Sequence, residues 1–182
     1  MLYLFRQGGW EAVNAAYADP PTTSEQIMHP SKYDDREPPL AIDLPDVAQA
    51  LGEGWEEVDV GVMGEFFYKL VLEERISTRR ASRAAAGWGG DRYVLLRGPG
   101  GSSLFLNLAR WDTERDAEEF YDGYVQSLEA RDIGLDKTDS VATGSFDGKQ
   151  HHVAVGGDET LLVLSTEPAA VDRMTPLFDL AS

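Results

Sequence analysis

Residues 93–111 read YVLLR-GPGG-SSLFLNLARW, and this stretch decides the fold. Two apolar runs flank a Gly-Pro-Gly-Gly turn. In the second run Leu104, Leu106 and Leu108 share one face, because side chains alternate along a strand. The pattern predicts two antiparallel strands, 93–97 and 103–111, joined as a hairpin.

The same order of elements occurs a second time further along the chain. A capped helix is expected over 114–130, a second hairpin over 150–166, and a last helix from Pro168 to Leu180. A further strand is expected over 55–60. These elements predict an α+β domain: an antiparallel sheet of about four to five strands, in two strand-strand-helix units, with helices on one face.

The region before this domain has a different pattern. Residues 2–18 carry apolar side chains at helical spacing, and Gly8-Gly9 separates two short helices. A further short helix is expected over 25–29. Four prolines within 30–46 argue against regular helix or central strand, so we expect an extended strap over the domain, with a linker as the alternative. We therefore divide the chain into an N-terminal helical segment with a proline-rich strap, 1–46, and an α+β domain, 47–182, in which helices over 64–76 and 79–86 are also expected.

Composition excludes several classes of protein. The 182 residues carry 16 basic and 32 acidic side chains, a formal net charge of −16, which repels nucleic acid. No apolar stretch approaches the length of a transmembrane segment, and the start, MLYLFRQGGW, is too short for a signal peptide. The absence of cysteine excludes a disulfide scaffold and a thiolate site. An acidic, lysine-poor surface is typical of a halophilic archaeon, and an acidic protein from a high-GC genome is the alternative.

The sequence offers no complete catalytic constellation. It contains no Gly-x-Ser-x-Gly elbow, no dinucleotide fingerprint and no phosphate-binding loop, so we expect no catalytic residues and no cofactor. Glu25 and His29 are four residues apart on an expected helix and are weak candidates for metal ligands. His151 and His152 are adjacent on a strand and face opposite ways, so a three-ligand zinc site is not expected.

An aromatic and charged cluster is the main candidate for ligand binding. It consists of Trp88, Asp91, Arg92 and Tyr93, with Trp111 from the neighbouring strand. One interpretation is a junction that locks helix to sheet, with Gly89-Gly90 as a sharp turn. The other is a small-molecule pocket, since such residues also line ligand sites.

Four segments, GGWEAVNAAY (8–17), PPTTSEQIMHPSKY (20–33), AGWGGDRY (86–93) and WDT (111–113), resemble a prokaryotic zinc-metallopeptidase-like (gluzincin-like) family. They are similar to the region that follows its catalytic helix. This chain has no His-Glu-x-x-His, so no metal ligand is carried over. The resemblance implies a companion domain, a truncated gene product or a piece of a longer protein. It also implies an extracytoplasmic location, with a cytoplasmic one as the alternative.

Three hypotheses about function follow. The first is a non-catalytic binding or structural companion of a zinc-peptidase-like protein, with a protein partner or an upstream domain. The second is an independent small-molecule-binding module that uses the cluster at 88–93. The third, an enzyme with an acid–base site at Glu25, His29 or Glu65, ranks last because no nucleophile can be placed. An exposed apolar face on the N-terminal helices would favour a homodimer.

Overall fold

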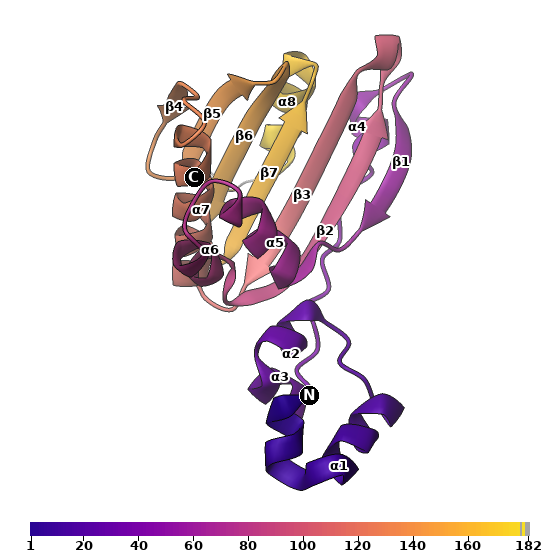
Figure 1. Cartoon of the computed structure of the whole chain (residues 1–182). Coiled ribbons are helices and arrows are strands. Elements are labelled where there is room, and N and C mark those ends of the chain that lie inside the picture. Colours follow the sequence, from indigo (N-terminus) through magenta and orange to yellow (C-terminus); the bar gives the residue numbers. More distant parts are fainter. Residues whose placement is uncertain (179, 181–182) are drawn as a thin grey trace. The chain divides into compact units, whose positions relative to one another are not determined.

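The computed structural model describes residues 1–178 and 180, and it divides into two compact units, Met1–Pro39 and Leu40–Ser182. We call them the N-terminal unit and the sheet domain. The division falls before the boundary expected at residue 46, so the second half of the expected strap belongs to the sheet domain (Figure 1).

The N-terminal unit consists of three helices, α1 (Leu2–Ala18), α2 (Ser24–Met28) and α3 (Pro30–Asp34). Gly8 and Gly9 interrupt α1 with non-helical backbone angles, at the place where the sequence predicts a break. The expectation of no helix after Pro30 is wrong, because α3 begins at this proline. Proline is tolerated in the first turn, where its missing N–H would have no partner in the helix.

Apolar side chains remain exposed on α1. Trp10 is 71% and Tyr17 75% exposed, while Val13 and Ala16 are buried. Dimerisation through such a face stays a prediction.

The sheet domain is built on one antiparallel sheet of seven strands in the order β1-β2-β3-β7-β6-β5-β4 (Figure 1). The strands are β1 (Glu56–Gly61), β2 (Trp88–Arg97), β3 (Ser103–Trp111), β4 (Leu135–Lys137), β5 (Val141–Phe146), β6 (Lys149–Gly156) and β7 (Glu159–Ser165). The helices are α4 (Val47–Leu51), α5 (Gly64–Glu73), α6 (Thr78–Ala85), α7 (Glu114–Glu129) and α8 (Pro168–Met174), with 3-10 turns at Pro99–Gly101 and Thr175–Leu177.

The α+β class and the antiparallel sheet are thus confirmed, but the expected number of strands is too low. Strands β4 and β5 lie where the sequence predicts a polar loop, because neither shows a clear alternation of apolar and polar residues. Strand β2 also begins earlier than expected. Gly89 and Gly90 are part of β2, with a bulge between Trp88 and Gly90, and do not form a turn before it.

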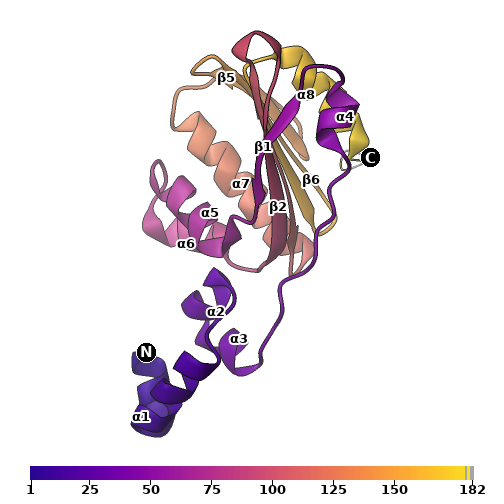
Figure 2. The same ribbon diagram turned by 90° about the vertical axis from the view of Figure 1, so that its right-hand side faces the viewer.

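Helices cover both faces of the sheet, which corrects the expectation of helices on one face. One buried cluster joins α5, α6 and α7 to the sheet through residues such as Tyr68, Leu72 and Phe120. The second joins α4 and α8 to the opposite face through residues such as Leu51, Leu104 and Met174. Figure 2 shows the sheet between these two layers of helices. We call the two sides the α7 face and the α8 face.

The strap residues at the start of the domain pack against the first strands. The Leu40 N–H donates to the Gly89 carbonyl oxygen at 2.8 Å, and a Cβ at Gly90 would lie 2.2 Å from the Leu40 oxygen. Glycine at 90 therefore allows two backbones to approach closely. Further along the strap, Ile42 and Leu44 pack against the α8-face core. Among the described helices, none has the length and apolar character needed to cross a membrane.

Candidate functional site

A buried polar network occupies the centre of the α7 face. Asp91 is 3% exposed, and its carboxylate accepts four hydrogen bonds. Oδ1 accepts from the Gly64 N–H and from Trp88 Nε1, both at 2.9 Å. Oδ2 accepts from the Met63 N–H and from Asn107 Nδ2, also at 2.9 Å. The four donors join the start of α5 to β2 and β3, so this carboxylate fastens a helix to the sheet.

The network continues to a buried phenol. The Tyr68 hydroxyl donates to Asn107 Oδ1 at 2.6 Å. Burial raises the pKa of Tyr68 well above its usual value, and the nearby Asp91 adds to this shift. Burial also raises the pKa of Asp91, against the opposing effect of its four hydrogen bonds. The Tyr68 hydroxyl therefore stays neutral and acts as a hydrogen-bond donor. Each polar atom named here has a hydrogen-bond partner inside the sheet domain.

The two tryptophans of the predicted cluster are also buried. Trp88 and Trp111 are paired across β2 and β3, and each is 1% exposed. The Trp111 ring stacks on Phe120 of α7 at 4.7 Å, and its Nε1 donates to Thr160 Oγ1 at 2.9 Å. Both indole N–H groups thus have partners inside the core.

The structure brings together only part of the predicted cluster. Trp88, Asp91 and Trp111 meet inside the α7-face core. Tyr93 is two residues further along β2 on the same face, and its hydroxyl donates to Asp59 Oδ2 at 2.8 Å. Arg92 lies between them in sequence and so projects to the α8 face. The sequence did not single out Asn107 or Tyr68. For Asn107 a signal was available, because it is a polar residue within the apolar run 104–109.

Part of the α7 face is not covered by helices. In Figure 1 the helices α5 and α6 lie in front of the lower part of the sheet, and the upper parts of β2 and β3 have no helix over them. Tyr93 and Leu95 of β2, Phe105 of β3 and Leu164 of β7 face this side of the sheet by strand alternation, and each is only half-buried. We call these four residues the open strip. Their neighbours on the α8 face, among them Val94, Leu96, Leu104 and Val163, are at most 4% exposed.

The strand register aligns three residues of the strip, Leu95, Phe105 and Leu164, into one row across the sheet. Asp59 pairs with Leu95, Leu95 with Phe105, Phe105 with Leu164, and Leu164 with His151. The Tyr93 and Phe105 rings stack with centroids 5.7 Å apart. The row is therefore apolar in its middle, with a carboxylate at the β1 end and an imidazole at the β6 end. Sequence reasoning did not identify this row.

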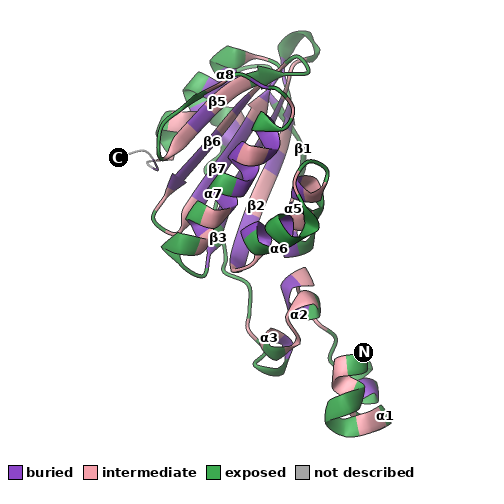
Figure 3. Cartoon of the chain, turned by 60° about the vertical axis from the view of Figure 1, so that its left-hand side comes forward, coloured by how far each residue is buried: buried purple, intermediate pink, exposed green. Residues whose placement is uncertain are grey.

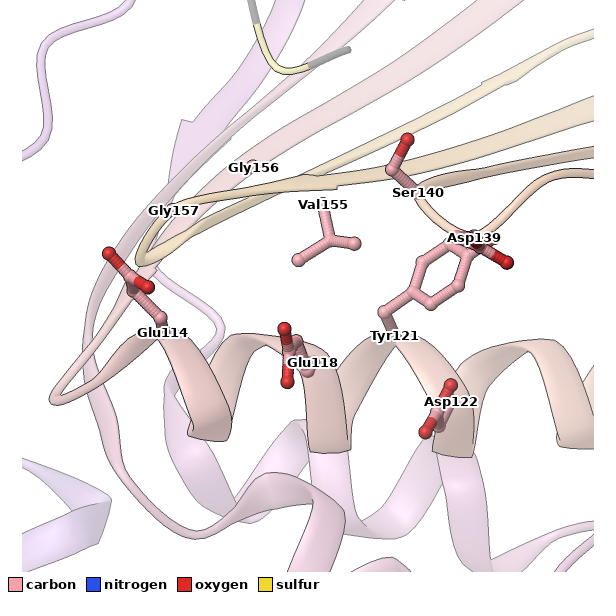
Figure 4. A pocket seen from close by; sticks show the side chains of 9 residues that line it. All are labelled: Glu114, Glu118, Tyr121, Asp122, Asp139, Ser140, Val155, Gly156 and Gly157. Carbon is pink, nitrogen blue, oxygen red and sulfur yellow. The ribbon is translucent and has the colours of Figure 1, made fainter. Parts of the chain in front are cut away.

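A pocket of about 330 Å³ lies elsewhere, between α7 and the β6–β7 hairpin. Figure 4 shows its lining: Glu114, Glu118, Tyr121, Asp122, Asp139, Ser140, Val155, Gly156 and Gly157. Three of the carboxylates follow one another at intervals of four residues along one face of α7. No three carboxylate oxygens among these described residues lie within 4.8 Å of one another, so the wall is acidic without forming a set of metal ligands.

The weak metal candidates lie in the N-terminal unit. Glu25 is on α2 and is buried, and its Oε1 lies 2.8 Å from Lys32 Nζ. His29 follows α2 and precedes α3. Lys32 offers Glu25 a cationic partner within its own unit. A metal site at Glu25 and His29 stays a prediction.

Comparison with known proteins gives three findings. No curated protein matches the sequence. The fold is similar to the extracellular domain of PknH from Mycobacterium tuberculosis, with a TM-score of 0.46 and 8% identity over 78% of this chain and 97% of that chain. Residues 49–175 match a family model described as Domain of unknown function (DUF8575), which spans the sheet domain from α4 to the end of α8.

Proposed function

The chain belongs to the DUF8575 family, and we propose that its sheet domain is a non-catalytic binding module that receives an amphipathic helix of a partner protein on the open strip. The single observation that carries the proposal is the asymmetry of the two sheet faces. The four residues of the open strip are half-buried on the α7 face, whereas their neighbours on the same strands are buried on the α8 face. A contiguous apolar patch that stays partly open to solvent is typical of an interaction site.

The central network supports a non-catalytic role. Asp91, Asn107 and Tyr68 resemble a reactive cluster in composition, yet their polar atoms bond to one another and to the start of α5. The N–H donors hold the carboxylate in place. Such a network rigidifies a core and fixes one arrangement of its elements.

The dimensions of the strip favour a single helix. From Leu95 to Leu164 the row crosses three adjacent strands, a distance of about 10 Å. A helix presents apolar side chains at i, i+4 and i+7 over about the same length, one for each strand. The helices α5, α6 and α7 already cover much of this face (Figure 3), so a partner helix would extend their layer.

The ends of the row favour one direction for that helix. Asp59 lies at the β1 end, and Arg131 and Lys149 lie near His151 at the other end. A helix carries partial positive charge at its N-terminus and partial negative charge at its C-terminus. The partner helix therefore points its N-terminus toward β1. The resemblance to the companion region of a zinc-peptidase-like family supports a partner of that kind.

The experiment uses synthetic helices as probes of the whole chain. A labelled peptide of about 14 residues carries leucines at i, i+4 and i+7, lysines in its first turn and glutamates in its last. Fluorescence anisotropy measures its binding against a scrambled peptide of the same composition. We expect binding of the patterned peptide only, and loss of binding in Leu95→Glu and Leu164→Glu.

Leu177→Glu is the matched control, because Leu177 is 48% exposed and lies outside the strip. Circular dichroism confirms that each variant folds. Equal binding of both peptides, or equal loss in all three variants, would contradict the proposal. Failure of the patterned peptide to bind the parent chain would also contradict the proposal.

A further inference from the structure

A lysine at the far end of the row has no carboxylate beside it. The chain has only four lysines, and Lys32, Lys69 and Lys137 each lie within 2.8 Å of a glutamate oxygen. Lys149, at the start of β6, makes no ion pair within the described part of the chain. In a protein of net charge −16, this is an unusual place for positive charge to accumulate.

A buried imidazole follows two residues later on the same face. His151 is 9% exposed, and among described groups its Nδ1 has no hydrogen-bond partner. The Phe146 backbone accepts a hydrogen bond from this side chain. The residues opposite it on the neighbouring strands are Gly144 and Leu164, which carry no charge. A buried nitrogen without a partner is destabilising, so it points to a group that joins it there.

Arg131 supplies a second positive charge from the end of α7. Its guanidinium carbon lies 6.0 Å from the centroid of Phe146, and the His151 ring lies 6.3 Å from the same centroid. The arginine is 15% exposed and contacts Glu74 at 3.5 Å, a distance too long for a strong ion pair. Arg131 and His151 therefore flank one aromatic ring, and Lys149 lies directly across from that ring in the β5–β6 register.

From these positions we infer that Arg131, Lys149 and His151 form a binding site for an oxyanion, a carboxylate or a phosphate group, at the β5–β6 hairpin. Two cations attract the anion, and the Phe146 ring, which is itself partly open to solvent, lies beside both Arg131 and His151. When the anion binds, Nδ1 takes up one proton from solvent and donates a hydrogen bond to it. The inference rests on these side chains and not on the proposed helix.

The protonation change provides a direct measurement. Imidazole nitrogen shifts of the ¹⁵N-labelled chain are followed by NMR through a pH titration, in sodium chloride, sodium phosphate and sodium acetate at equal ionic strength. In chloride, burial and the neighbouring cations Arg131 and Lys149 keep the pKa of His151 below its usual value. In phosphate or acetate we expect this pKa to rise by about one unit or more. The two anions distinguish a phosphate site from a carboxylate site.

The chain contains a control histidine for the titration and a control lysine for the loss of charge. His152 is adjacent in sequence but lies on the α8 face, so its titration should not change between salts. Lys149→Gln should weaken anion binding about tenfold, whereas Lys137→Gln, which removes a lysine paired with Glu129, should leave it unchanged. The inference would be overturned if the pKa of His151 were the same in all three salts. It would also be overturned if phosphate or acetate shifted the pKa of His152 as much as that of His151.

Discussion

Asn107 on β3 donates a hydrogen bond from Nδ2 to Oδ2 of Asp91 on β2, at 2.9 Å. This bond ties the two central strands to the carboxylate that holds α5. In Asp91→Asn one oxygen becomes an NH₂ group that faces N–H donors. We expect the free energy of unfolding to fall by about 3 kcal/mol, measured by urea denaturation.

Asp122→Asn is the control for this change, because Asp122 is exposed on α7. It should shift the free energy of unfolding by no more than about 0.5 kcal/mol. Equal effects of the two substitutions would show that Asp91 does not anchor α5.

The strap depends on the absence of a side chain at one position of β2. In Gly90→Ala the new Cβ would lie 2.2 Å from the Leu40 carbonyl oxygen, which is a backbone atom and cannot rotate away. We expect a loss of about 2 kcal/mol or more, and faster proteolysis between the two units. Gly134→Ala meets no atom within 4 Å and should be neutral by both measurements.

A comparison of two tyrosines distinguishes a buried hydrogen bond, which should contribute to stability, from an exposed one, which should not. Tyr68→Phe leaves the buried Asn107 Oδ1 without its donor, so the free energy of unfolding should fall by about 1–2 kcal/mol. Tyr93→Phe removes a bond to the exposed Asp59, where water replaces the donor, and should leave the unfolding midpoint unchanged. A larger effect at Tyr93 would contradict the assignment of the network to the core.

Stability should depend on pH through the two strand histidines. Burial lowers the pKa of both His151 and His152 in the folded chain, and Asp172 on α8 partly opposes the shift at His152. Below about pH 6.5 the unfolded chain therefore binds protons that the folded chain does not. The free energy of unfolding should fall as pH decreases from 7 to 5.5, by at most about 1.4 kcal/mol per pH unit for each histidine.

Denaturation in chloride buffers at several pH values checks this expectation, since phosphate would engage the inferred anion site. The double variant His151→Gln/His152→Gln should show a flatter dependence in the same range. A slope that survives in the double variant would assign the effect to other groups.

The central hairpin and α7 could be predicted from sequence because local signals agree there. Alternating leucines, a Gly-Pro-Gly-Gly turn and the Thr113 cap specify strand, turn and helix without help from distant residues. The second hairpin follows for the same reason. The order in which the hairpins join is not local, because β3 pairs with β7, which lies about 50 residues further along the chain.

The features that could not be predicted depend on contacts between residues that are remote in sequence. Strand β4 at the edge of the sheet and its neighbour β5 are held by pairing more than by apolar alternation. Leu95 and Phe105 read as ordinary core residues, and only the position of the helices shows that they lie on an open surface. Asp91 was identified as a candidate, but its role depends on Asn107 and on α5, which are remote in sequence.

The pairing of β3 with β7 has a consequence for synthesis of the chain. A ribosome releases the β2–β3 hairpin well before β7, so for that interval a nine-residue apolar strand has one edge without a partner. A nascent chain at this stage is open to association with other nascent chains. The acidic residues of α7 follow β3 immediately, and their mutual repulsion between polysomal neighbours would protect the strand until residue 165 emerges.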